Sequence, residues 1–238
     1  MLLQAADRRL GLSEALAECL RDPRQPGKLT HSQLEVLRQR IFGIALGYPD
    51  ANDAQGLAED PIHKLLLGRD PVEGEPLASQ PTISRFENGV GRVDLYRMSE
   101  TLAEVVIERH RKRLRGRRVR CITLDFDPTD DPTHGQQEFT FFHGYYDTYC
   151  YLPLLGTMAF NGEKAQYLVC AMLRPGNSAA HVGLIAVLCR VLERLWAAFP
   201  KARIRVRLDG GFGAPHVLDF LDDNGVEYVV GLLSLIHI

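Results

Sequence analysis

Two aspartates stand where expected strands end, and this placement is typical of a divalent-metal site. Residues 119–126 carry apolar side chains over the length of one buried strand, and the chain then enters the acidic segment that begins with Asp127. A second expected strand, 204–208, leads directly into Asp209. Mg²⁺ and Mn²⁺ prefer carboxylate oxygens, and a pair of such ions can stabilise both the entering and the leaving oxygen of a phosphodiester. We therefore predict a Mg²⁺ or Mn²⁺ site formed by Asp127 and Asp209.

The elements around these aspartates must bring them together across 82 positions. An Asn-Gly turn at 161–162 joins two expected strands, 151–160 and 165–173, and a long amphipathic helix is expected over 180–199. A helix at 215–223 and a strand at 226–230 complete the order β-β-β-α-β-α-β. A right-handed crossover places the first and fourth strands side by side and parallel, so that their carboxyl ends meet. This order predicts an α/β fold of the ribonuclease-H-like class.

The chain before this region is patterned as helices. A capping box at 32–35 begins a helix with apolar residues at helical spacing, and Asp60 followed by Pro61 begins another. We therefore predict two domains. Residues 1–115 form an all-helical DNA-binding region, and residues 116–238 form the ribonuclease-H-like catalytic domain.

Basic side chains in the helical region indicate a polyanionic partner. The helix expected over 79–88 carries Thr82 and Arg85 on its early turns, which suits contacts with phosphates and base edges, although a solvated helix in a bundle explains them equally well. Eight of the twelve residues 109–120 are Arg or Lys, whereas the helix dipole accounts for two or three. A solvated linker is the alternative. The predicted DNA contacts are Thr82, Arg85, Arg111, Lys112, Arg113, Arg115, Arg117 and Arg118.

Composition restricts the compartment and the class of partner. The 238 residues are 45% hydrophobic with a net charge of −2, so DNA binding has to come from local patches and not from the overall field. Five widely spaced cysteines without a C-x-x-C pair favour reduced thiols in the cytoplasm. The sequence has neither an export signal nor an apolar run long enough to cross a bilayer, so we expect no membrane partner.

Three longer motifs carry a family resemblance. They are Leu124-Asp-Phe-Asp-Pro-Thr-Asp-Asp-Pro-Thr-His-Gly-Gln-Gln137, Phe142-His-Gly-Tyr-Tyr-Asp-Thr-Tyr-Cys-Tyr-Leu-Pro-Leu154 and Arg207-Leu-Asp-Gly-Gly-Phe-Gly213. With these motifs the chain resembles the DDE transposases of the insertion sequence 1380 group, within the insertion sequence 4 clan. The resemblance implies a bacterial, cytoplasmic, DNA-associated enzyme. Such an enzyme cuts DNA with Mg²⁺ or Mn²⁺ and joins the freed 3′ hydroxyl to target DNA.

The resemblance also implies roles for individual residues. The first catalytic aspartate falls on Asp127, with Asp125 as the second choice because it shares the strand face, and the second falls on Asp209. The third acid, a glutamate on a later helix, has no counterpart, because Glu227 lies inside the last expected strand and the chain ends at residue 238. We therefore expect this chain to be a C-terminally truncated fragment that binds metal weakly and does not cleave DNA.

The implied partners are double-stranded DNA, as terminal repeats and target, and a second copy of the chain in the transposition complex. Two other functions stay open. A ribonuclease-H-like nuclease would cut without joining strands, and a regulatory fragment would bind DNA without chemistry. A nucleotide-binding domain is disfavoured, since the glycines at 210, 211 and 213 do not form G-x-G-x-x-G.

Overall fold

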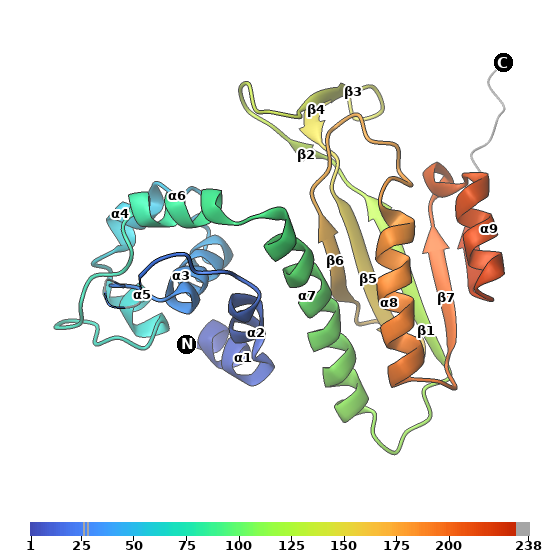
Figure 1. Cartoon of the computed structure of the whole chain (residues 1–238), viewed down its shortest axis with the longest axis horizontal. Coiled ribbons are helices and arrows are strands. Elements are labelled where there is room, and N and C mark those ends of the chain that lie inside the picture. The colour runs from blue at the N-terminus through green and yellow to red at the C-terminus, as the bar shows by residue number, and fades with distance from the viewer. Residues whose placement is uncertain (26, 28, 232–238) are drawn as a thin grey trace. The chain divides into compact units, whose positions relative to one another are not determined.

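The computed structural model describes residues 1–25, 27 and 29–231, and the chain divides into two compact units between Thr101 and Leu102 (Figure 1). The division falls inside helix α7 (Arg92–Arg113), which contributes residues to both units. The largely apolar residues 232–238, after the last expected strand, lie outside the described residues. No helix within the described ranges is long and apolar enough to cross a membrane.

The first unit is helical, as the sequence predicts. Its helices before α7 are α1 (Leu2–Leu10), α2 (Leu12–Glu18), α3 (Gln33–Ala45), α4 (Asp53–Leu57), α5 (Pro61–Leu66) and α6 (Gln80–Gly89). The capping box is present at α3, where the Glu35 N–H donates to the Ser32 hydroxyl at 3.2 Å and the Ser32 N–H donates to the Glu35 carboxylate at 2.8 Å. The side chain of Asp60 caps α5, which begins at Pro61. Capping chemistry therefore sets where these two helices begin.

The second unit is built on a mixed five-stranded sheet. Its strands are β1 (Cys121–Pro128), β5 (Leu154–Phe160), β6 (Tyr167–Met172), β7 (Arg203–Leu208) and β8 (Glu227–Val230), in the order β6-β5-β1-β7-β8. β1 pairs antiparallel with β5 and parallel with β7, β5 pairs antiparallel with β6, and β7 pairs parallel with β8. Helices α8 (Leu184–Ala198) and α9 (Pro215–Asp223) connect the parallel strands. This confirms the predicted ribonuclease-H-like order.

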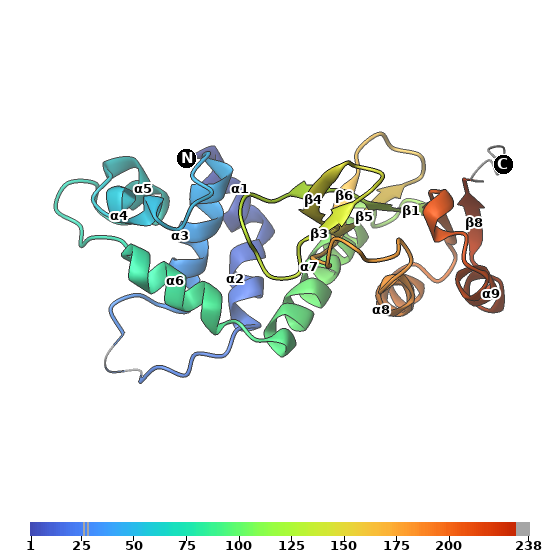
Figure 2. The same ribbon diagram turned by 90° about the horizontal axis from the view of Figure 1, so that it is seen from above.

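Helices cover one face of this sheet. Figure 2 shows α8 and α9 on the same side of the strands. Along β1 the buried residues alternate with partly exposed ones, and Ile122, Leu124 and Phe126 face the helices in a core that also includes Ala103 and Ile107 of α7. The opposite face carries polar side chains, including Asp125 and the arginines of β7. Arginines therefore alternate with buried residues along β7.

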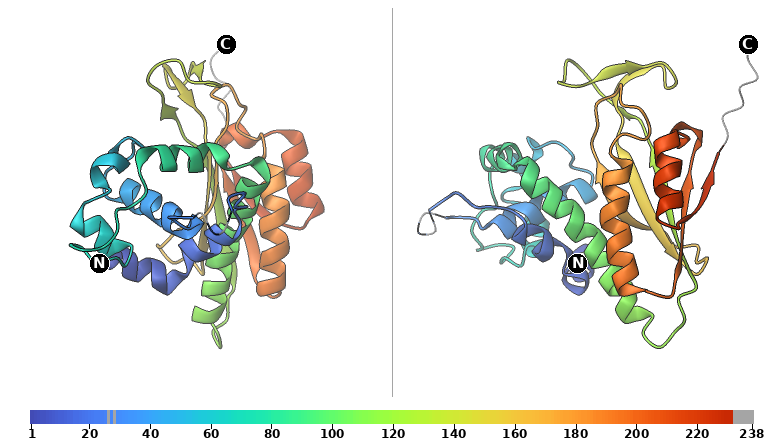
Figure 3. Two further views of the ribbon diagram at one scale, coloured as in Figure 1. Left: turned by 60° about the vertical axis from the view of Figure 1, so that its left-hand side comes forward. Right: turned by 45° about the vertical axis from the view of Figure 1, so that its right-hand side comes forward.

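The aromatic segment after β1 forms a separate small sheet, which the sequence pattern does not reveal. Its strands are β2 (Asp131–Pro132), β3 (Phe141–His143) and β4 (Thr148–Tyr151), in the order β2-β4-β3. Figure 3 shows this sheet beyond one end of β5 and β6. The strand expected over 151–160 is divided because Pro153 has no N–H to donate to a ladder. One segment ends as β4 and the next begins as β5.

Candidate active site

Asp127 and Asp209 come together at one edge of the main sheet. β1 and β7 run parallel, and the last paired residues of their ladder are Phe126 and Leu208. The next residue of each strand is the predicted aspartate, so both carboxylates leave the sheet at the same edge, and both residues are exposed. The topology thus joins the two acids that the sequence singles out.

The charge of Asp209 influences the ionisation of Asp127. Partial burial raises the pKa of Asp127, and the negative charge of Asp209 raises it further. Two like charges at one sheet edge are most stable when a proton or a cation reduces their repulsion. The donor set, carboxylate oxygens open to solvent, suits a hard divalent cation.

The backbone after β7 holds Asp209 in place. The Gly211 N–H donates to Oδ1 of Asp209 at 2.9 Å, and this bond caps the 3₁₀ helix Gly210–Phe212. A Cβ on Gly211 would lie 2.9 Å from the Cβ of Ala180, so a side chain at position 211 would press on the loop before α8. Close packing against Ala180 accounts for this glycine.

Asp125 faces a different partner. Arg207, its cross-strand neighbour, donates from Nε to one carboxylate oxygen and from Nη2 to the other, the second bond at 2.6 Å. Gln166 also donates to Asp125 at 3.4 Å. A bidentate guanidinium occupies the positions that a metal ion would need. The geometry therefore favours Asp127 over Asp125 as the first ligand.

Glu227 is also engaged elsewhere. Its carboxylate accepts hydrogen bonds from Arg203 at 3.3 Å and from Arg205 at 2.9 Å, on the polar face of β8. Among residues 1–25, 27 and 29–231, no group of three or more His, Cys, Asp and Glu side chains is arranged to hold a metal ion. The described part of the site consists of two carboxylates.

Arg174, which the sequence analysis does not single out, organises the loop beside the acids. Only 3% of this residue is exposed, and its guanidinium donates to four backbone carbonyls, those of Leu152, Ala179, Ala180 and Val182, at 2.8–3.4 Å. Ala180 packs at Gly211, directly beside Asp209. The sequence does not indicate that this arginine is buried, because its hydrogen-bond partners are backbone carbonyls and no acidic side chain stands beside it in the sequence.

The predicted basic segment lies at the opposite end of the sheet from the acids. It precedes β1, whose first residues pair with the start of β7, whereas the acids follow the ends of both strands (Figure 1). A groove of about 400 Å³ here is lined by basic and apolar side chains. We name this surface the basic groove. Its basic side chains are those of Arg111, Arg115, Arg117, Arg118 and Lys201.

Some cationic side chains of the segment 109–120 are already paired with acids. Arg111 and Lys112 pair with Glu108, at 2.7 and 3.6 Å, and Arg113 pairs with Glu163 at 2.7 Å. The guanidinium groups of Arg115, Arg117 and Arg118 make no ion pair with any described residue. These three arginines are the strongest phosphate-binding candidates in the segment.

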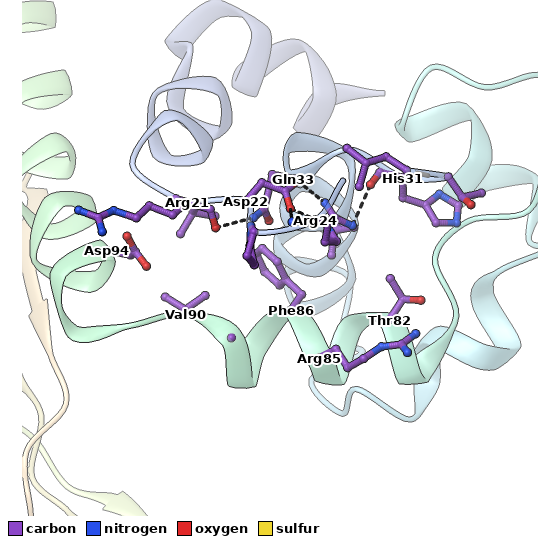
Figure 4. Close-up of a pocket in the computed structure, with 16 residues that line it drawn as sticks. Arg21, Asp22, Arg24, His31, Gln33, Thr82, Arg85, Phe86, Val90 and Asp94 are labelled. Atoms are coloured by element: carbon purple, nitrogen blue, oxygen red, sulfur yellow. Dashed lines mark hydrogen bonds and ion pairs between the residues drawn. The ribbon is translucent and has the colours of Figure 1, made fainter. Parts of the chain in front are cut away.

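Thr82 and Arg85, the predicted contacts in the helical unit, line a pocket of about 550 Å³. Figure 4 shows both on α6, across from Arg24 and His31. Arg24 is paired with Asp22 at 2.7 Å and donates to the His31 carbonyl at 3.1 Å. The exposed guanidinium of Arg85 therefore supplies an accessible cation to this pocket.

Comparison with known proteins identifies a family. The family model described as transposase DDE domain group 1 matches residues 1–235. No curated protein matches. Three solved structures show low similarity. The piggyBac transposase synaptic complex with hairpin DNA is 12% identical, with a TM-score of 0.36, over 95% of this chain and 48% of that chain.

The pre-cleavage Mos1 transpososome is 14% identical, with a TM-score of 0.29, over 87% of this chain and 61% of that chain. The mariner Mos1 paired end complex with Mg is 14% identical, with a TM-score of 0.26, over 75% of this chain and 57% of that chain. This chain thus spans about half to three fifths of the length of those proteins.

The family match covers nearly the whole chain and includes both the helical unit and the sheet that carries the two aspartates. The chain belongs to the transposase DDE domain group 1 family.

Proposed function

We propose that this chain contributes Asp127 and Asp209, as ligands of Mg²⁺ or Mn²⁺, to metal-dependent DNA cleavage and strand transfer by a transposase of the insertion sequence 1380 group. The observation that supports this most is the placement of two exposed carboxylates at the ends of adjacent parallel strands, where the charge of one raises the pKa of the other. A site of this kind is occupied most favourably by a cation.

The residues around the pair have separate tasks. Asp127 and Asp209 hold the ion, and the N–H of Gly211 fixes the orientation of Asp209. Arg207 keeps the carboxylate of Asp125 away from the site. The bound cation would withdraw negative charge from the phosphodiester oxygens during cleavage.

The partner in this proposal is double-stranded DNA, both as terminal repeats and as target, held by a homodimer. The basic groove lies about 20 Å from the acids, since six residues of β1 at about 3.3 Å each separate Cys121 from Asp127. A phosphate bound in the groove is therefore roughly six base pairs from the cleaved bond if the duplex follows β1, at about 3.4 Å per pair. The groove would hold the duplex while the acids act on its end.

The family resemblance requires a third acid, a glutamate, and among the described residues no group of three acids is arranged to hold a metal ion. We propose that the two aspartates alone bind the ion loosely and that residues 1–238 do not complete cleavage. Mg²⁺-dependent cutting of DNA by this chain would contradict that part of the proposal.

Titration with Mn²⁺, followed by electron paramagnetic resonance, tests the metal site. We expect Asp127→Asn and Asp209→Asn each to weaken Mn²⁺ binding on the order of 10- to 100-fold, the range seen when a metal site loses a supporting group. Asp125→Asn is the matched control, because it removes a carboxylate two positions away that is paired with Arg207, and it should change the affinity less than about threefold. Equal losses of Mn²⁺ affinity in all three variants would contradict the choice of Asp127 over Asp125 as a metal ligand.

A DNA-binding fragment without chemistry is the second candidate, favoured by the distance between the basic groove and the acids. It predicts DNA affinity that is independent of Mn²⁺ and unchanged in Asp127→Asn and Asp209→Asn. The same purified variants, titrated with a labelled duplex with and without Mn²⁺, separate the two functions.

A further inference from the structure

The segment from the end of β1 to the end of β4, residues 129–151, has an unusual composition, and we name it the aromatic arm. It contains three Phe and four Tyr residues within 23 positions, with no Lys, Arg, Ile, Leu, Val or Met. Its charged side chains at neutral pH are four acids, Asp130, Asp131, Glu138 and Asp147. The arm is therefore aromatic and acidic, with no aliphatic side chain other than proline.

Five aromatic residues of the arm are exposed, and Phe141, at 40%, is the least exposed of them. Phe142 and Tyr149 are cross-strand partners on β3 and β4, 52% and 61% exposed, with ring centroids 5.6 Å apart in an edge-to-face arrangement. Tyr145, in the turn between these strands, is 85% exposed, and Phe139 is 65% exposed. Large exposed rings gathered on one small sheet are typical of a surface that binds a partner.

The arm stands beside the acid pair. The hydroxyl of Tyr146 donates to the carbonyl of Pro128, the residue after Asp127, at 3.3 Å. Burial raises the pKa of Tyr146, and the charge of Asp127 raises it further. The ring of Tyr145 contacts that of Tyr146 with centroids 5.0 Å apart. The exposed rings thus extend from the edge of the sheet where Asp127 and Asp209 emerge.

The backbone that carries the rings is packed against a neighbouring loop. The N–H of Gly176 donates to the carbonyl of Phe139 at 3.2 Å, and a Cβ on Gly176 would lie 2.0 Å from the carbonyl oxygen of Cys150 and 2.8 Å from that of Phe141. The loop that Arg174 organises therefore packs directly against the backbone of β3 and β4. A fixed aromatic surface loses little conformational entropy when it binds.

The chemistry of the arm favours a planar, uncharged partner. Four carboxylates with no Lys or Arg repel phosphates, so the arm is unsuited to the backbone of a duplex. A docking surface for another protein would be expected to carry Met and Arg with its aromatics and to have few acids. Nucleobases are planar and uncharged, and they stack on aromatic side chains without sequence preference.

We propose that Phe142, Tyr145 and Tyr149 stack on unpaired bases of a DNA end held at the acid pair. The inference depends on the proposed function for the presence of DNA at Asp127 and Asp209. It adds a second mode of DNA contact, to bases and not to phosphates, next to the site of cleavage.

The test compares single-stranded and blunt double-stranded DNA. The probes are a fluorescein-labelled oligothymidylate of 12 nucleotides and a blunt 12-base-pair duplex, each titrated with the full chain and followed by anisotropy. We expect Phe142→Leu and Tyr149→Leu each to weaken binding of the single strand about fivefold or more, since stacking contributes substantially for each base. Binding of the duplex should change less than twofold.

Two further variants serve as controls. Tyr145→Leu changes a side chain that is almost entirely in solvent, so it tests stacking without a risk to folding, and it should also weaken single-strand binding. Trp196→Leu removes an exposed ring near the end of α8, just before β7 begins, and it should have no effect. Leucine keeps the apolar character of each position but removes the aromatic face.

Unchanged single-strand affinity in all three arm variants would overturn the inference. So would a loss of self-association in sedimentation with DNA affinity intact, which would identify a second copy of the chain as the partner of the arm. The experiment also distinguishes failure of the proposed metal site from failure of the stacking surface. If the arm variants lose single-strand affinity while Asp127→Asn leaves Mn²⁺ binding unchanged, the stacking surface stands and the proposed nuclease function does not.

Discussion

At the scale of single residues, the distinguishing property of the site is that folding disfavours the charged form of Asp127. A raised pKa means that folded Asp127 holds its proton more tightly than the unfolded chain does. Ionisation of this residue therefore lowers the free energy of unfolding as pH rises from the ordinary aspartate pKa through the raised value. Sites that bind ligands commonly carry such a cost in their empty form.

This gives a prediction on stability. Without divalent cations, Asp127→Asn should melt at a slightly higher temperature than the wild type at pH 7, because asparagine carries no charge to repel Asp209. The difference should disappear near pH 3, where the wild-type carboxyl is protonated. Differential scanning calorimetry across this range is the measurement. A variant less stable than the wild type at pH 7 would show that the carboxylate is stabilised by a neighbour and not repelled.

The sequence reveals the acids but not the choice between them. Asp125 and Asp127 share a strand face, so periodicity treats them alike, and only the cross-strand register shows that Arg207 lies opposite Asp125. That register depends on how β1 aligns with β7, more than 70 residues away, and no local pattern contains this information.

At the scale of elements, the order of strands and helices was predictable because each element has a clear hydrophobic period or a capping signal. The aromatic arm was not, because both faces of its strands carry aromatic side chains. Phe141, which pairs with the buried Cys150, is 40% exposed and its neighbour Phe142 is 52% exposed, so apolar character does not alternate. The loop after β6 was equally hidden, since Arg174 fixes it through backbone carbonyls alone.

A prediction at this scale concerns Arg174. Arg174→Met should lower the free energy of unfolding by about 1 to 3 kcal/mol, because it leaves buried carbonyls without a donor. Arg115→Met, at an exposed position, should change stability by less than about 0.5 kcal/mol. Urea denaturation of both variants gives the comparison. Equal stability of the two would mean that water replaces the guanidinium and that the loop does not depend on it.

At the scale of the whole molecule, the second unit separates two kinds of charge. Acids that suit a cation stand at one end of the sheet, and the basic groove stands at the other. This separation keeps the arginines from neutralising the aspartates, so each end stays available for its own ligand. Net charge alone, at −2, conceals both regions.

The salt dependence of DNA binding tests this arrangement. The triple variant Arg115→Ala/Arg117→Ala/Arg118→Ala should reduce the slope of log affinity against log salt by about 2.7 in magnitude, since each lost phosphate contact removes about 0.9. The matched triple Arg111→Ala/Lys112→Ala/Arg113→Ala should reduce it less, because those side chains are paired with Glu108 and Glu163. Equal changes in slope would show that the pairs open when DNA binds.

The most direct test of the account is the Mn²⁺ affinity of Asp127→Asn, Asp209→Asn and the double variant, measured by electron paramagnetic resonance on the same preparation. If one ion is shared by both carboxylates, each single variant loses most of the affinity and the double variant loses little more, so the two effects are far from additive. Additive losses, or single variants that bind Mn²⁺ as the wild type does, would contradict a shared metal site at the ends of β1 and β7.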